Sequence, residues 1–141
     1  MIKRLIIISM VMIGIINMTG CKETSKLGTS SETSTVENSY EQISQKEAKV
    51  LMDTEKDYII LDVRTAEEFS EAHIEGAILI PDYEIGEKAE EILADKEQLI
   101  LVYCRSGRRS KNASAELAEM GYTNVKEFGG IIDWKYGTVT K

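Results

Sequence analysis

Cysteine, proline, histidine and tryptophan are scarce in this chain of 141 residues, which has two, one, one and one of them. Basic residues are also in the minority, because 17 lysines and arginines stand against 24 acidic residues and give a net charge of −7. That balance, without a basic stripe or aromatic residues placed between basic ones, argues against a nucleic-acid-binding protein. Any function that depends on positive charge must therefore be local.

The only long apolar run lies at the N-terminus, over residues 5–18, directly after Lys3 and Arg4. A positive start followed by an apolar run too short to span a membrane comfortably is typical of a secretory signal peptide. The run ends in Met18-Thr19-Gly20-Cys21, which resembles the lipobox of bacterial lipoproteins. The resemblance implies cleavage before Cys21 and acylation of its thiol, whereas a plain signal peptide or an uncleaved anchor would leave that thiol free.

We therefore expect residues 1–20 to be a lipoprotein signal peptide and the mature chain to be held at the cell membrane, on its extracytoplasmic face. Cleavage would leave 15 basic and 24 acidic residues, a net charge of −9. Acylation of Cys21 would make Cys104 the only free thiol and would exclude an internal disulfide. Residues 21–39 are rich in Ser, Thr and Glu without an apolar period, which predicts a flexible linker.

Residues 40–141 carry the pattern of a folded domain. Capping boxes at Ser44–Glu47 and Thr65–Glu68 predict two helix starts. The periodicity predicts helices over 44–52, 65–71, 84–93 and 110–120, and short apolar strands over 58–61, 77–80, 99–103 and 124–128. Strands of this kind that alternate with helices predict an α/β fold, a single domain whose parallel sheet has helices on both faces.

Cys104 lies in the stretch LILVYCRSGRRSKN, residues 99–112, where three arginines follow it within five positions. Ligands of open α/β sheets bind beyond the carboxyl ends of the strands, and Cys104 ends the most apolar one. The next helix should begin within about six residues, and its free N–H groups favour an anion. Gly107 allows the tight loop that this requires. We expect the pKa of Cys104 to be lowered.

This stretch resembles the active-site loop of the rhodanese family. Further segments agree with the family in the same order along the chain, and together they cover residues 40–137: Leu61–Phe69, His73–Ala77, Ile80–Pro81 and Gly129–Trp134. Ala66 and Leu79 depart from it, since the family often has proline and asparagine there, but neither touches the chemistry.

The resemblance implies a sulfurtransferase that carries sulfane sulfur as a persulfide on Cys104, taken from a donor such as thiosulfate and passed to a thiol or to cyanide. It implies no metal and no organic cofactor. The loop that would hold the outer sulfur consists of Arg105, Ser106, Gly107, Arg108, Arg109 and Ser110. Asp62 and Arg64 would orient neighbouring loops, and His73 and Trp134 fit packing positions better than catalytic ones. We expect a monomer.

Other interpretations of Cys104 remain open from the sequence. A cysteine after a strand is often only a small buried apolar residue. Cysteine-dependent phosphatases and arsenate reductases hold an anion in a similar loop, but theirs has arginine where this chain has Ser110. A binding module that kept the fold and lost the chemistry would typically lack the cysteine. A persulfide carrier or thiol sensor at the cell surface would use an unchanged loop.

Overall fold

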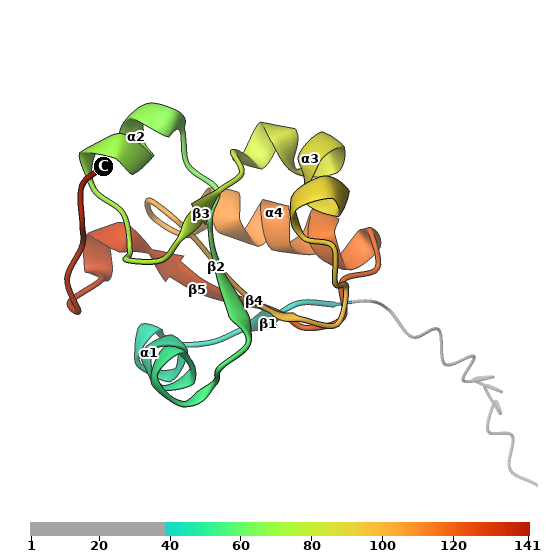
Figure 1. Ribbon diagram of the computed structural model, residues 1–141, viewed down its shortest axis with the longest axis horizontal. Coiled ribbons are helices and arrows are strands. Elements are labelled where there is room, and N and C mark those ends of the chain that lie inside the picture. The colour runs from blue at the N-terminus through green and yellow to red at the C-terminus, as the bar shows by residue number, and fades with distance from the viewer. Residues whose placement is uncertain (1–38) are drawn as a thin grey trace, which may run out of the picture. The chain divides into compact units, whose positions relative to one another are not determined.

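The most apolar strand, β4 (Leu99–Cys104), is the central strand of a five-stranded parallel sheet in the computed structural model, which describes residues 39–141 (Figure 1). The strand order is β1-β5-β4-β2-β3. The other strands are β1 (Glu41–Gln42), β2 (Tyr58–Asp62), β3 (Ile78–Leu79) and β5 (Val125–Gly130). All six residues of β4 are buried, as expected for a strand covered on both faces.

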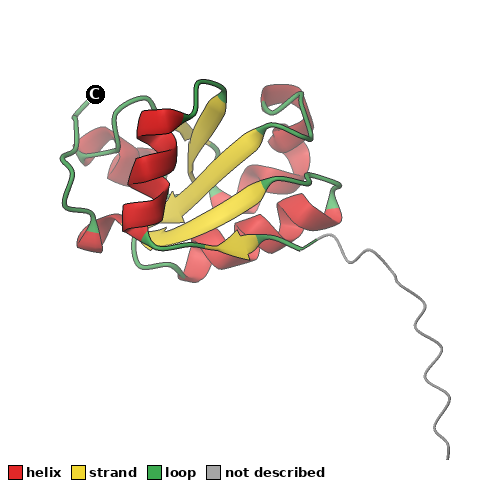
Figure 2. Ribbon diagram, turned by 90° about the horizontal axis from the view of Figure 1, so that it is seen from below, coloured by secondary structure: helices red, strands yellow, loops and turns green. Residues whose placement is uncertain are grey.

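Helices cover both faces of the sheet, which confirms the predicted α/β architecture (Figure 2). The helices are α1 (Gln45–Thr54), α2 (Ala66–Glu71), α3 (Ile85–Ile92) and α4 (Arg108–Glu119), with 3-10 turns η1 (Asp82–Glu84) and η2 (Ile131–Asp133). On one face, Ala48 of α1 packs with Leu101 and Phe128. On the other face, α3 and α4 pack on Leu61, Ile100 and Val102. β4 is therefore buried between the two layers.

Both capping boxes form as predicted, and the remaining differences are local. Helix α4 begins at Arg108, two residues earlier than expected, because Gly107 adopts a left-handed conformation (φ 98°) and caps it. The strand expected over 77–80 is shortened to β3, an edge strand that is only partly buried. β1 was not predicted, because its two exposed residues carry no apolar pattern; they join β5 through the backbone and through an ion pair between Glu41 and Lys126.

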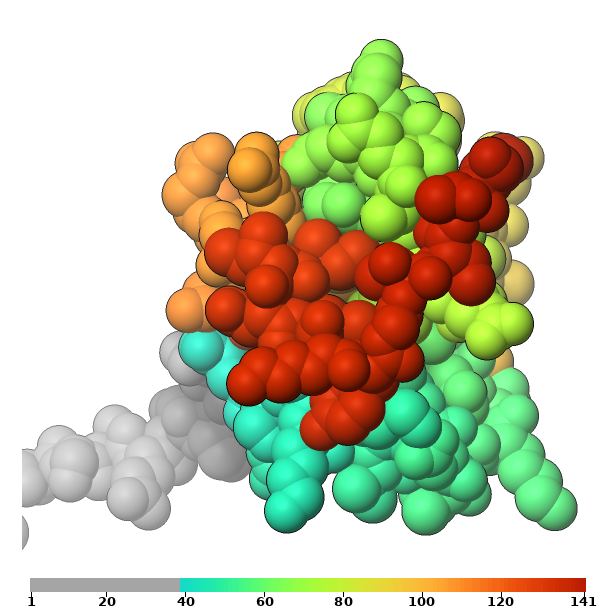
Figure 3. Space-filling view, turned by 90° about the vertical axis from the view of Figure 1, so that its left-hand side faces the viewer, coloured from blue at the N-terminus to red at the C-terminus, as the bar shows by residue number. Residues whose placement is uncertain are grey.

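Figure 3 looks onto the carboxyl-terminal end of the sheet, where the loop after Cys104 (orange) lies beside the C-terminal segment (red). That segment is tied to the turn after α2 by two backbone hydrogen bonds of 2.8 Å between His73 and Val139. Within residues 39–141, no helix has both the length and the apolar character needed to span a membrane. The proposed signal peptide and Cys21 lie outside the described residues.

Candidate active site

Cys104 ends β4 at the carboxyl edge of the sheet, and only 1% of its surface is exposed. Its sulfur lies inside the turn that joins β4 to α4, where the backbone N–H of Gly107 donates to Sγ at 3.0 Å. The turn contains only Arg105, Ser106 and Gly107 before α4 begins. The first-turn N–H groups of α4, which have no partner within the helix, therefore lie beside the sulfur.

The surroundings of the sulfur favour its ionised form. Burial alone raises the pKa of the Cys104 thiol. Hydrogen bonds from the Ser110 hydroxyl and from the N–H groups of Ser110, Gly107 and Ser106 outweigh that effect, so the pKa lies below its ordinary value. The direction expected from the strand–loop–helix pattern is confirmed. A thiolate held in this way is a stronger nucleophile and metal ligand than a thiol.

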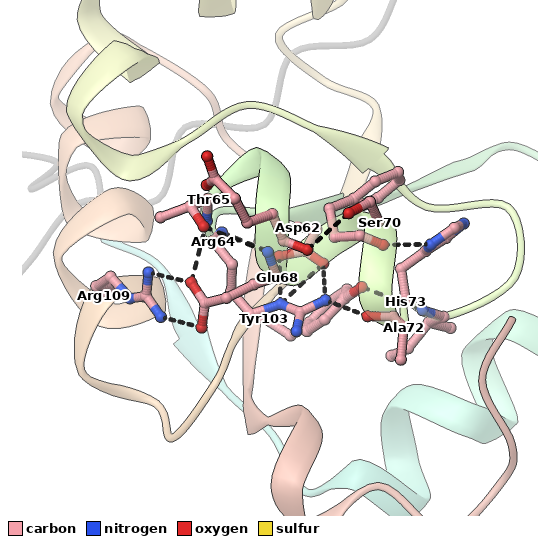
Figure 4. Close-up of polar contacts among 12 residues, drawn as sticks. Asp62, Arg64, Thr65, Glu68, Ser70, Ala72, His73, Tyr103 and Arg109 are labelled. Atoms are coloured by element: carbon pink, nitrogen blue, oxygen red, sulfur yellow. Dashed lines mark hydrogen bonds and ion pairs between the residues drawn. The ribbon is translucent and has the colours of Figure 1, made fainter. Parts of the chain in front are cut away.

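The three arginines of the loop have different surroundings. Arg105 and Arg108 are exposed, and neither forms an ion pair among residues 39–141. Arg109 instead donates to both oxygens of Glu68, at 2.8 and 2.9 Å (Figure 4). This bidentate contact lowers the pKa of Glu68 to about 2. Glu68 also accepts from the N–H of Thr65 at 3.1 Å, so the capping box of α2 is joined to the start of α4.

Asp62 and Arg64 form a buried ion pair at the end of β2 (Figure 4). Arg64 Nη2 lies 2.6 Å from Asp62 Oδ2 and also donates to the carbonyl of Ala72 at 2.7 Å. The guanidinium lies over the ring of Tyr103, 5.6 Å from its centroid. These contacts connect β2, the end of α2 and β4.

His73 has packing contacts rather than a catalytic geometry. Its Nδ1 lies 2.8 Å from the carbonyl oxygen of Phe69, and its ring stacks on the Phe69 ring with centroids 3.9 Å apart. Trp134 similarly packs against Phe128 and Tyr136. Among residues 39–141, no group of three or more histidine, cysteine, aspartate or glutamate side chains is arranged to hold a metal ion.

Two residues of β5 that lie outside the predicted site, Glu127 and Gly130, lie against the loop. Glu127 is buried and accepts hydrogen bonds from the Ser110 hydroxyl at 2.6 Å and from the N–H of Gly129 at 2.8 Å. Gly130 lies so close to the loop that a Cβ atom there would be 2.2 Å from the carbonyl oxygen of Arg105. Period-2 alternation could have identified Glu127, because it lies on the same face of the strand as the buried Val125.

Comparisons with known proteins agree with this geometry. Residues 44–136 match the family model described as "Rhodanese-like domain". The chain is 42% identical over 73 residues to a thiosulfate sulfurtransferase, PspE, of Escherichia coli, covering 52% of this chain and 70% of the relative. It is 37% identical over 97 residues to a thiosulfate sulfurtransferase, GlpE, of Coxiella burnetii, covering 68% and 88%.

The fold is likewise similar to a solved structure described as a rhodanese with anions from E. coli. The TM-score is 0.56 and the identity 38%, over 60% of this chain and 99% of that chain. The match to the family model covers strands β2 to β5, the loop after Cys104 and the residues that pack against it. The chain therefore belongs to the rhodanese-like family.

Proposed function

We propose that the protein is a sulfurtransferase that moves sulfane sulfur from a small anionic donor such as thiosulfate to a thiol or to cyanide, through a persulfide on Cys104. One observation carries the proposal: the Cys104 sulfur lies within a turn of N–H donors that lower its pKa, at the carboxyl edge of the sheet. The names of the relatives support rhodanese-type sulfur transfer in general.

The transfer would proceed in two half-reactions. The Cys104 thiolate attacks the outer sulfur of thiosulfate, a new S–S bond forms, and sulfite leaves with the electron pair of the bond that breaks. The acceptor thiolate or cyanide then attacks the outer sulfur of the persulfide, and the Cys104 thiolate leaves. The N–H groups of Ser106, Gly107 and Ser110 would hold the negative charge, and no cofactor takes part.

The surroundings of the sulfur favour a small anionic donor. Because Cys104 is only 1% exposed, a donor has to reach the sulfur through the opening of the loop, which suits a small molecule better than a protein. The net charge of −7 would repel a dianion at a distance. Arg105 and Arg108 reverse the sign of charge locally, because they are exposed next to Cys104.

We also propose that the domain acts at the extracytoplasmic face of the cell membrane, anchored through an acylated Cys21. The support is the sequence pattern of a positive start, an apolar run and Met18-Thr19-Gly20-Cys21. Residues 21–39 would then connect the anchor to the domain.

Steady-state kinetics with thiosulfate and cyanide test the proposed reaction. A persulfide intermediate predicts ping-pong kinetics, which are parallel lines in double-reciprocal plots, and no turnover by Cys104→Ser. Intersecting lines would contradict the two-step route, and turnover by Cys104→Ser would remove Cys104 from the reaction. Persulfide loading without turnover would indicate a carrier, and hydrolysis of a phosphate ester would indicate a phosphatase.

A further inference from the structure

Three arginines follow Cys104, but they do not contribute equally to the positive charge around it. Arg105 and Arg108 are exposed and form no ion pair among residues 39–141. Arg109 differs from both, because its guanidinium meets the carboxylate of Glu68 in α2. The loop therefore carries two free positive charges rather than three.

The contact between Arg109 and Glu68 is bidentate. Nη1 of Arg109 donates to Oε2 of Glu68 at 2.8 Å, and Nη2 donates to Oε1 at 2.9 Å (Figure 4). Two parallel hydrogen bonds between ionised groups fix direction as well as distance. The carboxylate thus cancels the charge of the guanidinium and also holds it toward α2.

Glu68 is held in place by groups other than Arg109. Its Oε2 accepts from the N–H of Thr65 at 3.1 Å, and its own N–H donates to the Thr65 hydroxyl at 3.3 Å, which completes the capping box of α2. The far end of α2 is fixed by Arg64, which donates to the carbonyl of Ala72 at 2.7 Å. The partner of Arg109 is therefore positioned by α2 and does not depend on the loop.

Arg109 is close enough to Cys104 for its charge to act there. It is the second residue of α4, and the N–H of Gly107, two residues before it, donates to the Cys104 sulfur at 3.0 Å. The guanidinium also interacts electrostatically with Cys104. An unpaired Arg109 would attract the incoming donor and the departing sulfite alike, and uniform binding of this kind lowers KM without raising kcat.

We propose that Glu68 sets the selectivity of the Cys104 loop for anionic reactants, because it cancels one of the three positive charges and holds the Arg109 guanidinium toward α2. Glu68 is a positioning residue, since it acts through Arg109 and does not touch the reacting atoms. Its effect is to let an anionic product leave. This inference deepens the proposed function and rests on Cys104 being the group that carries sulfur.

Other charged groups near the pair do not replace Glu68. Asp62 and Arg64 form their own buried ion pair, which adds no net charge. Asp82 of η1 interacts electrostatically with Arg109. Within residues 39–141, however, both side-chain hydrogen bonds that Arg109 donates go to Glu68. The direct control of the Arg109 charge therefore lies with Glu68.

The test compares alkylation of Cys104 by iodoacetate, an anion, with alkylation by the neutral iodoacetamide. The full-length chain is used at a pH where neither rate rises further, with peptide mapping to separate Cys104 from Cys21. Glu68→Gln removes the charge but keeps a residue suited to the capping box. The ratio of the iodoacetate rate to the iodoacetamide rate should rise about two- to five-fold at low ionic strength. The rise should largely disappear in about 1 M salt.

Two further variants complete the cycle. Arg109→Gln leaves the charge of Glu68 unpaired, so the ratio should fall below that of the wild type. The double variant removes the pair as a neutral unit, so its ratio should return close to the wild-type value. Glu91→Gln makes the same change in net charge on the exposed surface of α3 and should leave the ratio unchanged.

An unchanged ratio in folded Glu68→Gln would overturn the proposal, and so would a double variant that keeps the ratio of Glu68→Gln. A purely structural role would alter both rates together and leave their ratio the same, which also counts as refutation. In turnover, Glu68→Gln should lower KM for thiosulfate and the inhibition constant of sulfite by similar factors. Alkylation does not require sulfur transfer, so the predicted ratios without any turnover would count against the proposed function alone.

Discussion

Gly130→Ala perturbs the loop without changing any group that takes part in the chemistry. A Cβ atom at this position would lie 2.2 Å from the carbonyl oxygen of Arg105 and 2.6 Å from Cα of Ser106. Ordinary contacts begin at 3.4 Å, and the atoms in the way are backbone rather than the end of a flexible side chain. The loop therefore has to retreat by about 1 Å, which at a catalytic site can cost about 100-fold in rate.

We expect Gly130→Ala to lower kcat/KM for thiosulfate by about 10- to 100-fold, which corresponds to about 1.4 to 2.7 kcal/mol in the activation barrier. The pH at which iodoacetamide alkylates Cys104 at half its maximal rate should rise at the same time, because the N–H donors move away from the sulfur. The assay is cyanide-dependent turnover, with a thermal melt to establish that the variant is folded.

Gly86→Ala in α3 is the matched control. A Cβ atom there would meet only the carboxylate end of Glu116, at 2.9 Å, which can swing aside. Replacing a glycine within a helix by alanine should stabilise the fold by about 0.5 to 1 kcal/mol and leave kcat/KM unchanged. Wild-type kinetics in folded Gly130→Ala would refute the view that the contact with Gly130 holds the loop in its reactive geometry.

Replacing Arg105 and Arg108 by Ala should raise KM for thiosulfate several-fold and change kcat less. The dependence of KM on ionic strength should become flatter, because salt screens charges over about 8 to 10 Å. An unchanged KM would show that the two arginines serve something else. Glu68→Gln should flatten the fall in stability between pH 5 and 2. In the wild type the pKa of Glu68 is lowered to about 2 by its pair with Arg109. The pair therefore stabilises the fold above the pKa of an unfolded glutamate, and this stabilisation, about 1 kcal/mol after screening, is lost as the pH falls toward 2. Cys21→Ala should block lipid labelling and leave an uncleaved precursor, whereas normal processing would indicate ordinary signal cleavage.

The sequence predicts those parts of the fold that short-range patterns encode. The capping boxes at Ser44 and Thr65 place two helix starts correctly, because their hydrogen bonds span only three residues. The apolar run before Cys104 likewise predicts the buried central strand. β1 has no such pattern, since it forms by pairing with the distant β5, through the backbone and the ion pair between Glu41 and Lys126.

The parts of the site that the sequence does not reveal depend on contacts between distant segments. Glu68 serves as a helix cap by its local pattern, but its pairing with Arg109 joins residues 41 positions apart. Glu127 reaches Ser110 only because β5 has an irregularity beside Cys104. Neither the bulge nor the close approach of Gly130 to the loop follows from residue type alone.

The mass of the intact chain after incubation with thiosulfate tests the central claim most directly. A persulfide on Cys104 predicts a gain of about 32 Da, one sulfur atom, that a reductant removes. Cys21→Ser should keep this gain and Cys104→Ser should lose it, so the two cysteines serve as controls for each other. A sulfur adduct that persists in Cys104→Ser, or no adduct on the wild-type chain, would contradict the assignment of Cys104 as the sulfur carrier.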